Sequence, residues 1–134
     1  MKKLKLLFIL ALLISCKSTP DVPPGDVSLK VFTALTSGEA QVIKDNIYIE
    51  DSIQRKSFEH YLDIAMSSQQ YDENTATFEE NYTVAKETID GDRAEVILVG
   101  DNPLGQPVRL TVKLLVVDGV WKVNGDHAVY GYDE

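Results

Sequence analysis

Few side chains of this 134-residue sequence could act as a general acid or base. His60 and Asp63 lie three positions apart, so on a helix they are neighbours, but their face is opposite Phe58 and Leu62. A catalytic base is expected in an apolar pocket, so a solvated pair is the favoured interpretation. His127 could line the mouth of a pocket, although a surface histidine is favoured there too. We therefore predict no catalytic residue.

Cofactor and metal chemistry have no support in the sequence either. It contains no metal-ligand spacing, no nucleophile elbow and no phosphate-binding loop. We therefore expect no metal and no cofactor.

The remaining reactive side chain is the thiol of Cys16, the only cysteine in the sequence. It follows a basic segment, residues 1–5, and an apolar segment, residues 6–14, too short to span a hydrocarbon core of about 30 Å as a helix. These two segments are typical of an export signal. With the small Ser15 before Cys16, they resemble the lipobox of bacterial lipoproteins, whose cysteine becomes the first mature residue. Residues 1–15 are then a lipoprotein signal peptide.

This resemblance implies a lipid anchor at Cys16. The thiol accepts a diacylglycerol thioether, and the freed α-amine can take a further acyl chain such as palmitate; several chains anchor a protein stably. Lys17 and Ser18 stand where an aspartate often marks inner-membrane retention, so the resemblance implies the outer membrane, facing the periplasm. Residues 16–25 predict a proline-rich tether that, when extended, holds the domain roughly 30 Å from the lipid surface.

Net charge argues against one class of partner. The 13 basic and 21 acidic residues give a formal charge of −8, and loss of residues 1–15 leaves 10 basic residues and a charge of −11. Nucleic acid backbones attract basic patches, so we expect no nucleic acid partner. The 44% hydrophobic and 25% charged residues fit one globular domain, which we place at residues 26–134.

Residues 83–123 predict an antiparallel sheet, because β-branched and aromatic runs alternate with turn signals. A two-residue turn at Asp118-Gly119 pairs Val116 with Trp121 and fixes the register of the pairs beside it. One face is then almost wholly apolar: Val108, Leu110, Val112, Leu114, Val116, Trp121 and Val123.

A second turn signal, Asp90-Gly91, predicts another hairpin. With these two residues as the loop, Lys86 lies opposite Glu95 and Val84 lies opposite Ile97. The opposite charges of the first pair favour this register.

The residues before the sheet predict three helices. Asp26 is a good N-cap for a helix that ends at Gly38, residues 39–45 can form a short second helix, and a third begins near Asp51. The third helix has an apolar stripe of Phe58, Leu62, Ala65 and Met66, with Glu59, His60 and Asp63 facing the other way.

Several segments carry a resemblance to a known family: Gly25-Asp26-Val27, Phe32-Thr33-Ala34-Leu35, Ser37-Gly38-Glu39, Asp90 to Val96, and Val117 to Val123. Together they resemble the small bacterial lipoproteins of domain of unknown function 4878, which are similar to the nuclear transport factor 2-like (NTF2-like), or cystatin-like, superfamily. The resemblance implies an α+β fold in which a curved antiparallel sheet wraps around a helix to form a cone. It implies no activity, because the family has none established.

The implied cone would have a pocket with an apolar lining, for which the candidates are Phe32, Leu35, Phe58, Leu62 and Trp121. Trp121 could stack on a ligand, but its position opposite Val116 favours core packing. Apolar side chains also lie on the predicted outer sheet face: Leu115, Val117 and Val120, together with Tyr82, Val84, Ile97 and Val99. Two interpretations stay open for this face. It forms a weak homodimer, as is common in the superfamily, or the tail of residues 128–134 covers it.

The sequence therefore favours a membrane-anchored periplasmic lipoprotein that acts as a binding or interaction module for a small apolar ligand or a protein partner. The alternative is a small isomerase- or dehydratase-like enzyme that uses the cone pocket. A buried carboxylate or histidine in the pocket wall would favour the enzyme. A pocket filled by Trp121, Phe32 and leucines would favour the module.

Overall fold

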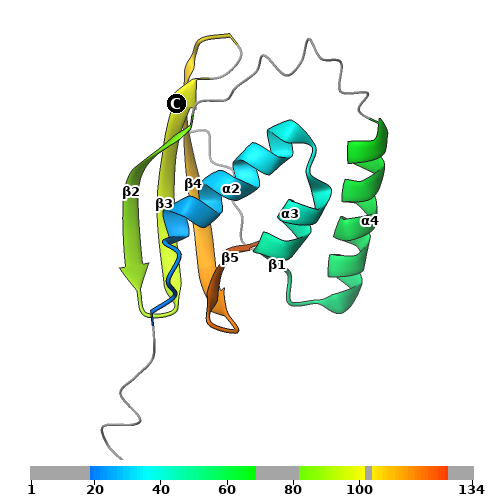
Figure 1. The fold of residues 1–134 in the computed structure, drawn as a ribbon, viewed down its shortest axis with the longest axis horizontal. Coiled ribbons are helices and arrows are strands. Elements are labelled where there is room, and N and C mark those ends of the chain that lie inside the picture. Colours follow the sequence, from blue (N-terminus) through cyan, green and yellow to red (C-terminus); the bar gives the residue numbers. More distant parts are fainter. Residues whose placement is uncertain (1–18, 69–81, 102–103, 127–134) are drawn as a thin grey trace, which may run out of the picture.

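A computed structural model of the protein describes residues 19–68, 82–101 and 104–126. Within these residues, helices cover one face of a five-stranded sheet (Figure 1). The helices are α2 (Pro24–Ser37), α3 (Ala40–Asn46) and α4 (Ser52–Ser68); the strands are β1 (Ile47–Tyr48), β2 (Thr83–Asp90), β3 (Arg93–Asp101), β4 (Pro107–Val117) and β5 (Val120–Asn124). The sheet order is β1-β5-β4-β3-β2, antiparallel except that β1 pairs with β5 in parallel. The predicted α+β class is confirmed.

The hairpin of β4 and β5 has the predicted register. Asp118 and Gly119 have φ values of 51° and 81°, the two positive angles of a type I′ turn. Val116 pairs with Trp121, and Leu115 pairs with Lys122. The turn and the apolar alternation therefore predicted the same pairing that the folded chain has.

The register predicted for β2 and β3 is wrong. Asp90 pairs with Arg93, so the loop is Gly91-Asp92, and Lys86 lies opposite Ile97 in place of Glu95. Gly91, with φ of 61°, takes the first loop position, whereas Gly119 takes the second. Two-residue turns accept glycine at either position, depending on their type, so an Asp-Gly pair alone does not fix the register.

A bulge between Val84 and Lys86 changes the face on which β2 begins. One extra residue reverses the side of every earlier side chain, so Val84 and Tyr82 pack against the core. The ring centroids of Tyr82 and Phe32, on α2, are 6.0 Å apart. The prediction that Tyr82 and Val84 lie on the outer face is therefore wrong.

The main core lies between α2 and the inner face of the sheet, which we define as the face that α2 covers. Its buried members are Val27, Val31, Ala94, Val96, Leu98, Leu110, Val112, Leu114, Trp121 and Val123. This set confirms the predicted apolar face, with Val108 and Val116 partly buried against it. A second cluster, around Ala34, Ile43 and Leu62, joins α2 and α3 to α4, which lies beyond α3 (Figure 1).

Helix α2 begins at Pro24, before the predicted cap Asp26, and has no side-chain cap of its own. Instead, the Gly25 N–H donates a hydrogen bond of 2.7 Å to Glu87 Oε1 on β2. A Cβ atom at position 25 would collide with Glu87 and Val84, so this close approach of helix and strand requires glycine. The sheet therefore fixes the point at which the chain enters the fold.

The other helix boundaries follow the predictions closely. Gly38 ends α2 in the left-handed conformation, with φ of 76°. Asp51 Oδ1 accepts hydrogen bonds from the N–H groups of Ile53 and Gln54 and so caps α4. None of the described helices is long and apolar enough to cross a membrane. Residues 1–18, His127 and the tail of residues 128–134 lie outside the described residues.

Candidate binding cleft

The residues predicted to line a pocket are divided between two packed clusters. Phe32 and Trp121 belong to the core between α2 and the sheet, whereas Phe58 and Leu62 belong to the cluster around α3. Leu35 packs against both clusters. The tertiary structure therefore places these side chains in two packed clusters, which Leu35 joins.

Buried polar groups of the described residues have little capacity for acid–base chemistry. The buried polar residues are Ser28 and Asn124, with no carboxylate or imidazole among them. Ser28 Oγ donates to the Pro24 carbonyl oxygen at 2.9 Å, and Asn124 Oδ1 accepts from the Asp126 N–H at 3.2 Å. Trp121 is 3% exposed, and its Nε1 has no hydrogen-bond partner in the described part of the chain. Burial of the indole ring therefore keeps Trp121 in place.

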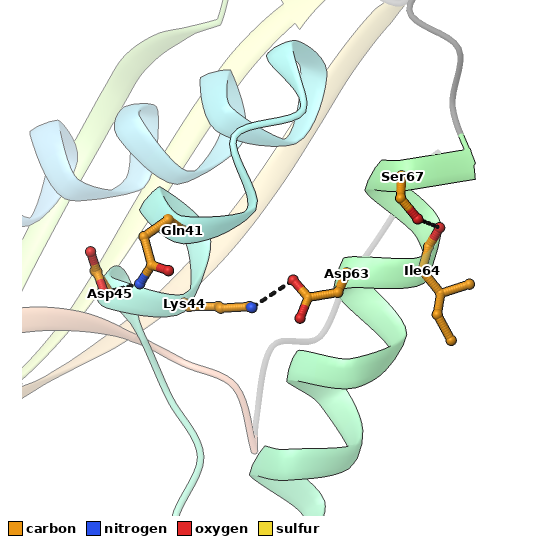
Figure 2. A network of polar contacts seen from close by, with 6 residues as sticks. All are labelled: Gln41, Lys44, Asp45, Asp63, Ile64 and Ser67. Atoms are coloured by element: carbon orange, nitrogen blue, oxygen red, sulfur yellow. Dashed lines mark hydrogen bonds and ion pairs between the residues drawn. The ribbon is translucent and has the colours of Figure 1, made fainter.

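His60 and Asp63 do not form a site. His60 is exposed on α4, and Asp63 Oδ1 is 2.6 Å from Lys44 Nζ on α3 (Figure 2). Both residues are exposed, as predicted, and Asp63 in addition bridges the two helices. Its side chain is 57% exposed, so the ion pair contributes at most about 1 kcal/mol to stability. Asp63 is therefore a surface contact between helices.

A cleft of about 420 Å³ lies where the chain enters the fold. Its walls are residues 20–22, the first turns of α2, the end of α3 and the start of β5. The lining residues are Pro20, Asp21, Val22, Asp26, Val27, Lys30, Asp45, Asn46, Gly119, Val120, Trp121 and Lys122. Val27 and Trp121 are buried, whereas Val22 and Val120 are about half exposed, at 54% and 50%.

Charged groups of both signs line the cleft. Asp21, Asp26 and Asp45 contribute carboxylates, while Lys30 and Lys122 contribute amines. Lys122 Nζ donates to the Asp45 carbonyl oxygen at 2.9 Å, which ties β5 to the C-terminal end of α3. No group of three or more potential metal ligands is present among the described residues. The cleft is suited to holding a small amphipathic molecule through apolar contacts and ionic groups.

Sequence reasoning missed this cleft. Its lining comes from segments far apart in the chain, and no local pattern marks them as neighbours. Trp121, which was predicted to line a pocket, does line this cleft, but strand alternation places Lys122, which also lines it, on the opposite side of β5.

One solved structure is similar to this arrangement of helices and sheet. It comes from Campylobacter jejuni and is named as an NTF2-like transpeptidase; the match has a TM-score of 0.57 and covers 77% of this chain and 98% of that chain. The chain has an NTF2-like fold. At 19% sequence identity, the similarity extends to the fold alone. No family model and no curated protein matches the chain, so its resemblance to domain of unknown function 4878 stays a prediction.

The outer face of this NTF2-like sheet carries the predicted dimer residues. Leu115 and Val117 are partly buried and Val120 is exposed, and Val117 pairs directly with Val120. Beside them is a hollow of about 340 Å³, lined by Thr88, Asp90, Arg93, Ala94, Glu95, Lys113, Leu114 and Asn124. An apolar patch next to groups of both charges is a combination found at protein interfaces.

Proposed function

We propose that the protein is a lipoprotein of the bacterial cell envelope, and that its NTF2-like domain is a binding or interaction module. The resemblance of residues 1–16 to a lipoprotein signal supports an anchor at Cys16, in the outer membrane and facing the periplasm. The cleft of about 420 Å³ is the candidate site for a small ligand, and the outer sheet face is the candidate site for a second copy or another protein.

One observation favours a module over an enzyme. The interior of the described domain is filled by apolar side chains, and the residues buried there include no carboxylate or imidazole. An isomerase or dehydratase would need such a group in an apolar pocket beside its substrate, whereas the cleft carboxylates Asp21, Asp26 and Asp45 are exposed. In the cleft, the amine of Lys122 donates to the Asp45 carbonyl oxygen, a contact that holds β5 to α3.

The transpeptidase name of the similar structure raises a second enzyme class. Transpeptidation needs a nucleophile that a nearby base activates. The only thiol in this chain is Cys16, the proposed lipid site, and the buried Ser28 hydroxyl donates to a backbone carbonyl oxygen. These contacts give no support to acyl transfer by this chain.

The anchor is tested by replacing the modified atom. Cys16→Ser should remove the thioether sulfur, so the variant should remain an uncleaved precursor and should not incorporate a labelled fatty acid. Wild-type chain expressed in parallel should be cleaved, labelled and recovered with the membranes. A serine variant that is still cleaved and labelled would overturn the proposed anchor.

A further inference from the structure

The structure shortens the free part of the tether. Pro20 and Val22 line the cleft, so only residues 17–19 separate Cys16 from a residue attached to the domain. Four extended residues span about 14 Å at most, roughly half of the stand-off expected for an extended tether of residues 16–25. A lipid on Cys16 would therefore hold the cleft close to the bilayer surface.

The connection between tether and domain is also fixed. Pro24 and Gly25 are buried at the start of α2, and the Gly25 N–H is bonded to Glu87 of β2. Residues just before Pro24 therefore cannot swing freely around the domain. The short tether consequently holds one particular end of the domain, the end where the chain enters α2.

Three exposed apolar side chains lie near that end, whereas Ile53, Tyr61 and Ile64 are exposed on α4. Arg93 pairs with Leu115, so the β2–β3 and β4–β5 hairpins lie at the same end of the sheet (Figure 1). Ile89 and Val120, beside these hairpins, are 49% and 50% exposed, and Val22 at the cleft is 54% exposed. We call these three residues, Val22, Ile89 and Val120, the tether-end patch.

The charges near the patch indicate which lipids it fits. Asp92 and Asp118 occupy the two hairpin loops, and Asp21 precedes Val22. Arg93 lies 4.0 Å from Asp92, and Lys30 and Lys122 line the cleft, but Asp26 and Asp45 there add two further carboxylates. Carboxylates at this end would be repelled by an anionic surface, whereas headgroups with no net charge impose no such cost. An apolar patch beside acidic groups therefore fits zwitterionic headgroups best.

We propose that the tether-end patch rests on the headgroup layer of a zwitterionic bilayer. The proposal depends on the lipid anchor at Cys16. Because the short tether gives the patch a high effective concentration at the lipid surface, even a contact of low intrinsic affinity is populated. The cleft then lies at the level of the headgroups, and the end of β4 that begins at Pro107 faces away from the membrane.

Two single-cysteine labels test this orientation. The sulfur of lipidated Cys16 is a thioether, so an introduced cysteine is the only reactive thiol in the mature chain. Val120→Cys places a fluorophore in the patch, and Leu104→Cys places one at the other end of β4, where Leu104 is 82% exposed. The eleven residues of β4 separate these ends by about 35 Å. Full-length lipidated protein is reconstituted in phosphatidylcholine vesicles that carry a nitroxide on the headgroup.

Quenching of the Val120 label should exceed quenching of the Leu104 label severalfold. Val22→Cys provides a second patch label, which should behave like Val120→Cys even if one variant folds poorly. Replacing part of the phosphatidylcholine with phosphatidylglycerol should weaken quenching at both patch positions; stronger quenching would overturn the preference for zwitterionic lipid.

Vesicle flotation distinguishes a failure of the proposed anchor from a failure of the proposed orientation. Protein that does not float with the vesicles would overturn the anchor and, with it, this orientation. Protein that floats but shows equal quenching at Val120 and Leu104 would overturn the orientation and leave the anchor standing.

Discussion

At the residue scale, Trp121 shows how the interior is built. Its ring is buried between α2 and the sheet, yet its Nε1 has no hydrogen-bond partner among the described residues. An unpaired buried donor costs about 1–3 kcal/mol, so the apolar area of the ring must outweigh that loss. Trp121 is therefore a packing residue.

Replacing Trp121 with alanine should lower the free energy of unfolding by about 3–5 kcal/mol, because a large cavity replaces the ring. Trp121→Phe keeps much of the packing and also removes the unpaired donor, so it should cost less than half as much. Urea denaturation of the soluble domain measures both losses. Equal losses for the two variants would contradict the packing role.

At the element scale, the start of α2 depends on β2. Glu87 supplies the cap that the residues around Pro23 lack, and Gly25 permits the close approach. Position 25 and position 87 are thus coupled, although the helix and the strand are distant in sequence.

Glu87→Ala should lower stability by about 1 kcal/mol, the usual loss for a missing helix cap. Gly25→Ala should cost about 1–3 kcal/mol, because its new methyl group collides with the Glu87 carboxylate. In the Glu87→Ala background, Gly25→Ala should cost less, since one of the two colliding groups is gone. A double-mutant cycle measured by thermal unfolding checks this coupling, and strictly additive losses would refute it.

At the scale of the whole molecule, the outer sheet face remains a candidate interface. In the described part of the chain, helices cover only the inner face, while Leu115, Val117 and Val120 lie on the outer one (Figure 1). The patch is smaller than predicted, because the bulge moves Tyr82 and Val84 into the core. Ile97 and Val99 are partly buried on β3, but they pair with Thr111 and Arg109, and the Glu95–Lys113 pair lies between them and Leu115.

We expect the soluble domain to form a weak dimer through this face. Burial of apolar area contributes roughly 25 cal/mol per Å², offset largely by association entropy. Salt should strengthen the dimer, because it screens the repulsion between two acidic chains. Sedimentation velocity at low and high salt measures the association.

Val117→Lys should abolish this dimer, whereas Ile53→Lys, at an exposed position on α4, should leave it unchanged. Loss of association in both variants would show that the loss is not specific to the outer face. A domain that is monomeric at every concentration and salt would leave residues 128–134 as the alternative cover for the face.

Local sequence signals determined much of the fold. Alternation along residues 108–123 identified the inner face, and the Asp118-Gly119 turn fixed its hairpin, because both depend on neighbours in the chain. Gly38 and Asp51 marked helix ends for the same reason. The candidate lipid site, Cys16, is likewise a purely local pattern, and it stays a prediction.

Tertiary contacts decided the rest. The position of β2 depends on α2, through the Gly25 to Glu87 hydrogen bond and the contact of Phe32 with Tyr82, so its bulge could not be predicted from the hairpin sequence. The cleft could not be predicted from the sequence either, because residues 20–22 meet β5 only after α2 has packed on the sheet. Sequence fixes which side chains are apolar and where the chain turns, but long-range packing selects among registers whose local energies are similar.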